Sequence, residues 1–427
     1  MSASVGARIA NGEVAAGFEA VADALASADL GGGGGAFAAF VEGRKVADLW
    51  IGDAAPGQPW AEDTMTTLFS SGKAVAALCA QVLYDRGDLD VDAPVVTYWP
   101  EYGAAGKEKT LVRHILAHTA GLPGLRQPET LLDWEGRGWG NYAGITERLA
   151  GSPPRWEPGT RVGYHGMTYG WLVAELVRRV SGKSLGTFLR EEIGEPFGLD
   201  LWIGTPEAEL PRVATLTPLA PPPPGPANPL HEAMHDLSHT PGTMHSEIYL
   251  LSDGRALPEM IGGFFATPAG RIPEVASAGV SASARSLAEM YAYLSLDGSL
   301  DGKRLVSPQA VERFAAEEFV GPSAIVPEPE VLAKHPEYSS LEPIWERWGL
   351  GYRLNVIDRP YPQTFGPEES AFGMPGAGAQ LGFADRVNRV SVGFVRNHMS
   401  PTWHASTQVV DALYKCLGVS PEASTNA

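Results

Sequence analysis

Apolar and polar positions follow a strand-like pattern near both ends of the chain. Residues 36–52 read AFAAFVEGRKVADLWIG, which predicts two strands joined as a hairpin near Gly43 and Arg44. Strand-like runs split by turns return in the last third, at 348–357, 378–387 and 388–397. The pattern therefore predicts that both chain ends contribute strands.

Apolar residues recur with helical spacing elsewhere. An amphipathic, Ala-rich stretch predicts a helix over 13–30, ended by the glycines at 31–35, and a second Ala-rich helix begins near Thr67 and stops at Gly87. Further helices are expected within 111–124, 167–185, 185–200, 279–298 and 409–418. The proline-rich run at 218–230 predicts an extended surface loop or strap.

This order of elements predicts an α/β protein of the α+β type. The economical arrangement is one antiparallel sheet assembled from both chain ends, flanked by helices, with a mostly helical unit inserted in the middle. We expect the sheet domain to take residues 1–90 and 270–427, and the helical insertion to take 91–269. A length of 427 residues is ample for two such units.

Composition and charge exclude several classes of protein. Apolar residues make up 44% of the chain and charged residues 19%, as in ordinary globular proteins. The net charge of −18 argues against nucleic acid and anionic membrane surfaces as partners, and Cys79 and Cys416 are too few for a disulfide framework. No run approaches the roughly 18 apolar residues of a membrane span, and no basic segment precedes an apolar one at the N-terminus. We therefore expect a cytoplasmic protein; its oligomeric state stays open, with a homodimer as one candidate.

The candidate chemistry lies at the start of the 67–87 segment. Ser70 falls in the first turn of the expected helix and Lys73 three residues later, so both side chains lie on one helical face. A serine hydroxyl needs a base to attack an acyl carbon, and a lysine can be that base if burial disfavours its charged form. The apolar run at 74–77 suits such a desolvated amine. On this tetrapeptide alone, the alternative is an N-capping serine beside a solvated lysine.

Four stretches, in order, resemble the serine beta-lactamase-like hydrolases, specifically the family VIII carboxylesterases and their acyltransferase relatives. They are FSSGKAV with Ser70 and Lys73, RHILAHTAGLPG at 113–124, PGTRVGYHGMTYGWLVAELVRRVSGKSL at 158–185 and FGMPGAGAQLGFAD at 372–385. The resemblance implies a beta-lactamase/transpeptidase-like fold and a Ser70 acyl-enzyme formed without a cofactor. It also implies a small-molecule ester as the substrate.

The same resemblance assigns roles in the second motif. Tyr164 falls on the family's catalytic tyrosine, and a phenol near a lysine can shuttle a proton between the nucleophile and the leaving group. Gly166 stands where penicillin-recognising relatives have asparagine, which disfavours a beta-lactam substrate. His165 is expected on the substrate-binding side.

The third motif of the family falls on Met374, Pro375 and Gly376, which are expected to bind substrate. The glycine allows close approach of the substrate, and the N–H groups of Ser70 and Ala377 would form the oxyanion hole. Relatives carry a polar or cationic group where this chain has Met374. That difference favours apolar substrates over those that need carboxylate recognition.

Two further motifs resemble other hydrolases. GKSLG at 182–186 fits G-x-S-x-G, but it lies between two expected helices, whereas a nucleophile elbow needs a preceding strand. Ser184 is therefore expected to be an N-cap. HEAMH at 231–235 fits H-E-x-x-H, with Glu232 as the would-be base and His239 as a third ligand. Because this motif follows proline-rich sequence and stops at a Thr-Pro-Gly turn, we expect a solvated histidine cluster and no metal.

His118 and several tryptophans are the remaining candidates. We expect His118 to be a structural histidine bonded to the backbone. The tryptophans that could line a cleft, with core packing as the alternative, are Trp134, Trp139, Trp345 and Trp348.

The leading hypothesis is a serine carboxylesterase acting on small to medium acyl esters. An acyltransferase or amide hydrolase, including a weak beta-lactamase, would use the same acyl-enzyme. From other classes, a non-catalytic ligand-binding protein on this fold and a metallohydrolase built on HEAMH stay open.

Overall fold

The computed structural model describes most of the chain. The described residues are 9–127, 131–132, 138–217, 236, 240, 243–249, 261–325, 344–356 and 365–419. The expected strap at 218–230 lies outside them.

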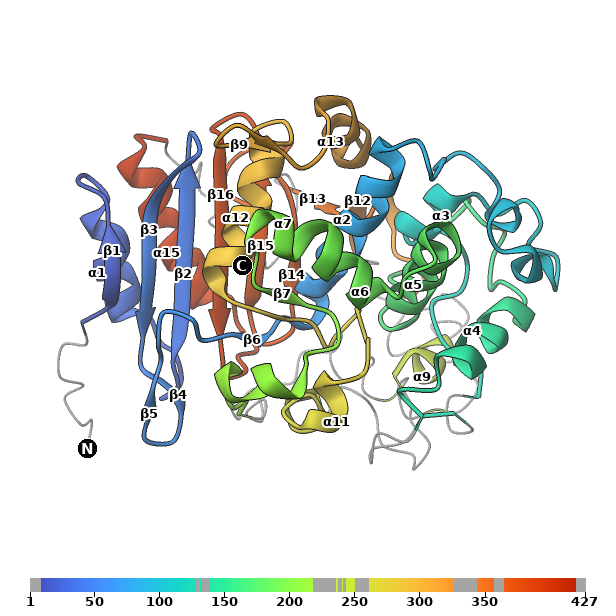
Figure 1. Ribbon diagram of the computed structural model, residues 1–427, viewed down its shortest axis with the longest axis horizontal. Helices are drawn as coiled ribbons and strands as arrows, with labels where there is room; N and C mark the ends of the chain where they lie inside the picture. Colours follow the sequence, from blue (N-terminus) through green and yellow to red (C-terminus); the bar gives the residue numbers. More distant parts are fainter. Residues whose placement is uncertain are drawn as a thin grey trace.

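A nine-stranded sheet organises the fold, and every pair of neighbouring strands is antiparallel (Figure 1). Strands from the two chain ends meet where β2 pairs with β16, which confirms the sheet expected from the sequence. From edge to edge the strands are β1 (Asn11–Val14), β3 (Arg44–Ile51), β2 (Gly35–Val41), β16 (Val390–Arg396), β15 (Gln380–Asp385), β14 (Phe372–Gly376), β13 (Arg353–Leu354), β12 (Trp345–Trp348) and β11 (Phe319–Pro322).

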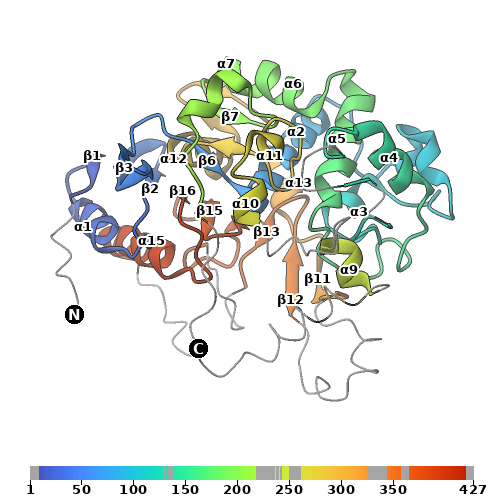
Figure 2. The same ribbon diagram turned by 90° about the horizontal axis from the view of Figure 1, so that it is seen from below.

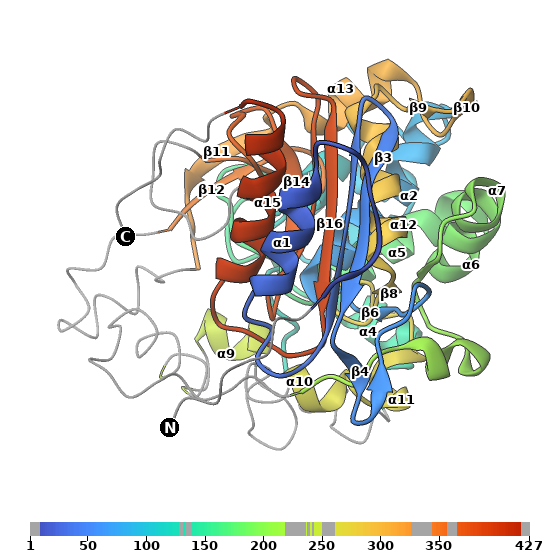
Figure 3. The ribbon, with the colours of Figure 1, turned by 90° about the vertical axis from the view of Figure 1, so that its left-hand side faces the viewer.

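Helices cover both faces of this sheet, which explains why its central strands are apolar throughout. The terminal helices α1 (Glu19–Ser27) and α15 (His404–Cys416) lie side by side on one face, and α12 (Ala284–Ser295) lies on the other (Figure 3). The helix α12 approaches β16 closely, because a Cβ on Gly393 would lie 2.3 Å from the carbonyl oxygen of Ala284. Only glycine fits at that contact.

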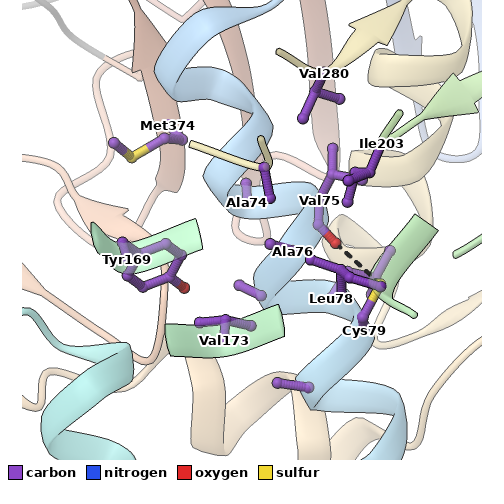
Figure 4. Close-up of a cluster of buried hydrophobic side chains, with 14 of the residues drawn as sticks. Ala74, Val75, Ala76, Leu78, Cys79, Tyr169, Val173, Ile203, Val280 and Met374 are labelled. Atoms are coloured by element: carbon purple, nitrogen blue, oxygen red, sulfur yellow. Dashed lines mark hydrogen bonds between the residues drawn. The ribbon is translucent and has the colours of Figure 1, made fainter. Parts of the chain in front are cut away.

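The helix α2 (Gly72–Asp85) is the centre of the main core. Its residues from Gly72 to Leu83 are all buried. Small side chains let it pack against α5 (Thr168–Ser181), with Tyr169 and Val173 of α5 and Met374 of β14 beside it (Figure 4). Gly87 follows α2 with a φ of 79°, as expected for the residue that ends it.

The other helices gather mostly at the end of the molecule away from α1 and α15 (Figure 2). They are α3 (Val112–Leu116), α4 (Tyr142–Gly151), α6 (Leu185–Leu189), α7 (Glu195–Phe197), α9 (Met244–Tyr249), α10 (Ile261–Phe264), α11 (Pro268–Arg271) and α13 (Pro308–Ala315). A three-stranded sheet of β6 (Thr66–Thr67), β8 (Ser281–Ala282) and β7 (Leu201–Trp202) connects them to the start of α2. Two hairpins complete the described strands, β4 (Asp53–Ala55) with β5 (Gln58–Pro59) and β9 (Ser299–Leu300) with β10 (Lys303–Arg304). The domain boundaries near residues 90 and 270 stay a prediction.

Two of the helix predictions were wrong in part. The stretch 13–30 begins as an extended segment, because β1 pairs with β3 and only the residues from Glu19 onward coil into α1. A single helix expected over 185–200 is instead α6, one π-helical turn at Arg190–Gly194 and α7, which ends where Gly198 takes a φ of 70°. Tertiary pairing overrode local helical preference in the first case.

Candidate active site

Ser70 lies in a tight turn that leads directly into α2. The turn is a 3₁₀-helix, η1 (Phe69–Ser71), and Phe69 takes the left-handed backbone conformation with a φ of 49°. The N–H of Leu68 donates to the carbonyl of Val280 at 2.8 Å, which ties the entry of the turn to the residue before β8. Ser70 therefore lies in the 3₁₀ turn that precedes α2. The sequence pattern had placed it in the first turn of the α-helix itself.

Three side chains meet at the hydroxyl of Ser70. Lys73 Nζ lies 3.1 Å from Ser70 Oγ, and the hydroxyl of Tyr164 donates to the same oxygen at 2.7 Å. Lys73 Nζ also donates to the carbonyl of Ser277 at 3.0 Å and lies 4.8 Å from the centre of the Tyr164 ring. The serine, lysine and tyrosine singled out from the sequence thus form one contiguous cluster.

Lys73 is fully buried, and this burial lowers its pKa well below 10.5. The described part of the chain places no carboxylate in an ion pair with it. A buried ammonium without a counter-ion is costly, so the geometry favours the uncharged amine. The alternative of a solvated surface lysine is excluded.

The cluster opens to solvent at only a few residues. Ser70, Tyr164 and Ala377 are half-buried, whereas the residues on either side of each are buried. These three residues therefore keep part of their surface exposed among the described residues, whereas Lys73 behind them is fully buried.

The strand β14 lies against the Ser70 turn. The hydroxyl of Ser71 donates to the carbonyl of Met374 at 2.8 Å, and a Cβ on Gly376 would lie 2.2 Å from the carbonyl oxygen of Leu68. Glycine is required at that position for the strand to approach the turn. Ala377 follows immediately after β14.

All four residues that were expected to bind substrate are buried: His165, Met374, Pro375 and Gly376. The Met374 side chain is 2% exposed and packs in the main core, so it is the carbonyl of this residue that contacts the turn. The His165 ring is fully buried; its Nε2 accepts from the N–H of Leu122 at 3.1 Å, and its Nδ1 lies 2.6 Å from the carbonyl of Gly163. Burial lowers the pKa of His165 to about 4. Since both ring nitrogens already have backbone partners, the geometry does not support the expected contact between His165 and a substrate.

The predictions for His118 and Ser184 are confirmed. His118 is fully buried, and its Nδ1 accepts from the backbone N–H of His165 at 3.0 Å. Ser184 caps α6, where its side chain accepts from the N–H of Thr187. Ser184 therefore has the position of a helix cap and not that of a nucleophile.

The HEAMH motif and Trp134 lie outside the described residues. Within the described ranges, no group of three or more His, Cys, Asp or Glu side chains could hold a metal ion. None of the helices there is long and apolar enough to cross a bilayer.

Of the three described tryptophan candidates, Trp348 borders the cluster. Its ring stacks on Tyr164, with centroids 5.9 Å apart. Trp139 instead packs among Trp171, Phe264 and Phe265 in the main core. Sequence reasoning missed Ser277, since a backbone carbonyl leaves no mark in residue type.

Comparison with known proteins identifies the family of the chain. The Beta-lactamase family model matches residues 21–412. The chain is 32% identical, over 377 residues, to the Esterase/beta-lactamase LipL of Mycobacterium tuberculosis, covering 86% of this chain and 77% of that protein.

Solved structures show the same fold. A penicillin-binding protein homologue from Caulobacter crescentus superposes with a TM-score of 0.76 at 33% identity, covering 95% of this chain and 99% of that one. A family VIII carboxylesterase superposes with a TM-score of 0.77 at 30% identity, with the same coverage of the two chains. The expected beta-lactamase/transpeptidase-like fold is thus confirmed. The chain belongs to the beta-lactamase family and is a serine hydrolase.

Proposed function

We propose that this protein is a carboxylesterase that hydrolyses small to medium acyl esters through an acyl-enzyme on Ser70. The observation that carries the proposal is the position of Ser70 Oγ, within hydrogen-bond distance of both Lys73 Nζ and the Tyr164 hydroxyl. A serine so placed has a base and a proton donor in contact with one oxygen.

In the first half-reaction, the uncharged amine of Lys73 takes the Ser70 proton as Oγ bonds to the ester carbonyl carbon. The C–O bond to the alcohol then breaks, and the alkoxide takes a proton through the Tyr164 hydroxyl, which the Lys73 ammonium replenishes. The carbonyl of Ser277 holds the amine in place at 3.0 Å. In the second half-reaction, water attacks the acyl carbon and its proton passes through the Tyr164 hydroxyl to Lys73. The bond to Ser70 Oγ then breaks, Lys73 returns a proton to Oγ, and the acid is released.

The negative charge that develops on the carbonyl oxygen needs fixed donors. We assign the backbone N–H groups of Ser70 and Ala377 to this role. Support comes from β14, which Ser71 and Gly376 hold against the Ser70 turn. Such donors are already in place before the reaction, so no reorganisation is needed as charge builds up.

An ester fits this cluster better than a charged amide or beta-lactam. Met374 offers no cation where the lactamases of this family commonly have lysine, and Gly166 offers no amide side chain. The similar Mycobacterium tuberculosis protein is nevertheless named for both activities, so a beta-lactam belongs in the assay panel.

Ser70→Ala tests the proposal with a short-chain aryl ester as substrate. We expect turnover to fall to background, and a fluorophosphonate to label the wild-type chain at Ser70 alone. Ser184→Ala is the matched control, because it removes a serine from a hydrolase-like motif at the cost of one helix cap, and should keep turnover. Unchanged turnover in Ser70→Ala would overturn the proposal. Product analysis with added alcohols or amines separates hydrolysis from acyl transfer.

A further inference from the structure

His118 holds an unusual backbone conformation in a fully buried place. It follows α3 and takes a left-handed φ of 60°, which non-glycine residues rarely adopt. Its side chain is 0% exposed. Such strain persists only where the surroundings impose it.

Two hydrogen-bond partners of His118 are the residues that flank Tyr164 in the chain. The N–H of Gly163 donates to the carbonyl of His118 at 3.1 Å, and the N–H of His165 donates to His118 Nδ1 at 3.0 Å. One residue thus accepts a hydrogen bond from each side of the tyrosine. The backbone of Tyr164 is held at both ends.

The imidazole of His118 packs among three aromatic rings. Its ring centroid lies 4.2 Å from that of Trp348, 4.7 Å from that of Tyr169 and 5.1 Å from that of Tyr164. Among the described residues, His118 Nε2 has no hydrogen-bond partner. The polar contact of the ring is therefore made through Nδ1, which must be unprotonated to accept the hydrogen bond.

Burial keeps the ring in that state. Burial of the ring is the main reason that the pKa of His118 lies well below 6.5. Both the burial of the ring and its hydrogen bond from the His165 N–H thus favour a neutral ring with an acceptor at Nδ1.

We propose that His118 is a positioning residue for Tyr164. By accepting from Gly163 and His165, it sets the backbone from which the phenol reaches Ser70 Oγ at 2.7 Å. The inference rests on the proposed role of Tyr164 in proton transfer. A histidine outside the Ser-Lys-Tyr cluster would then control the rate without touching the substrate.

Two amide substitutions separate this role from bulk packing. In His118→Asn, the side-chain oxygen stands near the position of Nδ1, and asparagine tolerates positive φ. In His118→Gln, the amide reaches the position of Nε2 and leaves the His165 N–H without its acceptor. We expect His118→Asn to keep most of kcat and His118→Gln to lose about 10- to 100-fold in kcat with little change in KM. Equal losses in both variants would overturn the proposal.

A double-mutant cycle with Tyr164→Phe supplies the second readout. If His118 acts through the phenol, adding His118→Gln to Tyr164→Phe should cause no further fall in kcat. The same fold-loss in both backgrounds would show a merely structural histidine and overturn the inference. If His118→Gln fails to fold, as judged by thermal melting, His118→Ala takes its place as the variant without an acceptor.

The cycle also keeps this inference apart from the proposed function. Tyr164→Phe alone should lower kcat; if it does not, the proton path through Tyr164 fails and the positioning role fails with it. If Tyr164→Phe lowers kcat but His118→Gln lowers it further by its full factor, only the positioning role fails. Fluorophosphonate labelling of Ser70 reports on the nucleophile independently of both.

Discussion

The ring of Trp348 lies almost parallel to that of Tyr164, with an interplanar angle of 13° and centroids 5.9 Å apart. Trp348 is fully buried, and its Nε1 donates to Glu346 Oε2 at 2.8 Å. The guanidinium carbon of Arg353 lies 5.6 Å from the centre of the tryptophan ring. The candidate proton donor therefore packs against a ring that is itself held by a hydrogen bond and a cation.

Replacing Trp348 should weaken both stability and turnover, by separable amounts. Trp348→Phe keeps a ring but removes the N–H that reaches the buried Glu346 carboxylate, so we expect the free energy of unfolding to fall by about 1–3 kcal/mol with kcat nearly retained. Trp348→Ala also leaves a cavity beside Tyr164. It should cost about 3–5 kcal/mol and lower kcat, as measured by denaturant unfolding and ester turnover.

Trp345→Phe is the control for this pair, because Trp345 lies on the same strand but is only half-buried. Its kcat should equal that of the wild type. If Trp348→Ala also kept the wild-type kcat, the stacked ring would contribute nothing to the position of the phenol.

Lys73→Arg should strongly lower turnover although it keeps a long basic side chain. A guanidinium retains its proton at any working pH and cannot take the Ser70 proton. The expected loss in kcat is about 10²- to 10⁴-fold, the usual worth of a general base. A steady-state ester assay measures it, and Lys45→Arg, which exchanges a partly exposed surface lysine, should behave as wild type. Retained turnover in Lys73→Arg would exclude Lys73 as the base.

The same lysine should make stability depend on pH in a defined direction. Burial lowers its pKa in the folded chain, so between that pKa and 10.5 the unfolded chain binds more protons at this position. The contribution of Lys73 to the free energy of unfolding therefore increases as the pH rises from the lowered pKa toward 10.5. Lys73→Met does not titrate and should remove the rise. Unfolding curves of the two proteins at several alkaline pH values compare the slopes; identical slopes would mean that Lys73 is charged in the fold.

Much of this fold could be predicted because its signals are local. The hairpin of β2 and β3 follows from two apolar, strand-like runs separated by a turn at Gly43. The start of α12 follows from Ser283, whose side chain accepts from the N–H of Ser286. Ser70 and Lys73 could be paired from their spacing alone, since one helical turn brings them together.

The rest depends on contacts between segments far apart in the chain. No local signal distinguishes β1 from the start of a helix, because β1 exists only by pairing with β3. The carbonyl of Ser277 contacts Lys73 across 204 positions of sequence, and any residue type could supply it. The burial of His165 likewise follows from how the loop at 118–122 folds over it. Sequence therefore predicted which side chains meet at Ser70 better than it predicted the backbone groups that hold them.

Gly376→Ala should disturb the Ser70 turn from the strand side. A Cβ at this position would lie 2.2 Å from the carbonyl oxygen of Leu68 and 2.9 Å from Ser71 Oγ, so β14 must move away from the turn. We expect a loss of about 1–3 kcal/mol in the free energy of unfolding and a fall in kcat. Gly151→Ala, at the end of α4, meets nothing within 4 Å and is the matched glycine control. A Gly376→Ala variant with wild-type melting temperature and kcat would contradict the close approach.

Ala377→Pro tests the second donor of the oxyanion hole, because proline lacks the backbone N–H and changes little else in side-chain size. Loss of one such donor should lower kcat by about 10²- to 10³-fold while KM for an aryl ester changes little. Ala377→Ser keeps the N–H and should retain kcat, and melting temperatures of both variants check that the turn after β14 is intact. Since a phosphonyl oxygen needs the same donors, fluorophosphonate labelling of Ser70 should slow in Ala377→Pro as well. A folded Ala377→Pro variant with wild-type turnover would remove this N–H from the mechanism and leave the oxyanion to other donors.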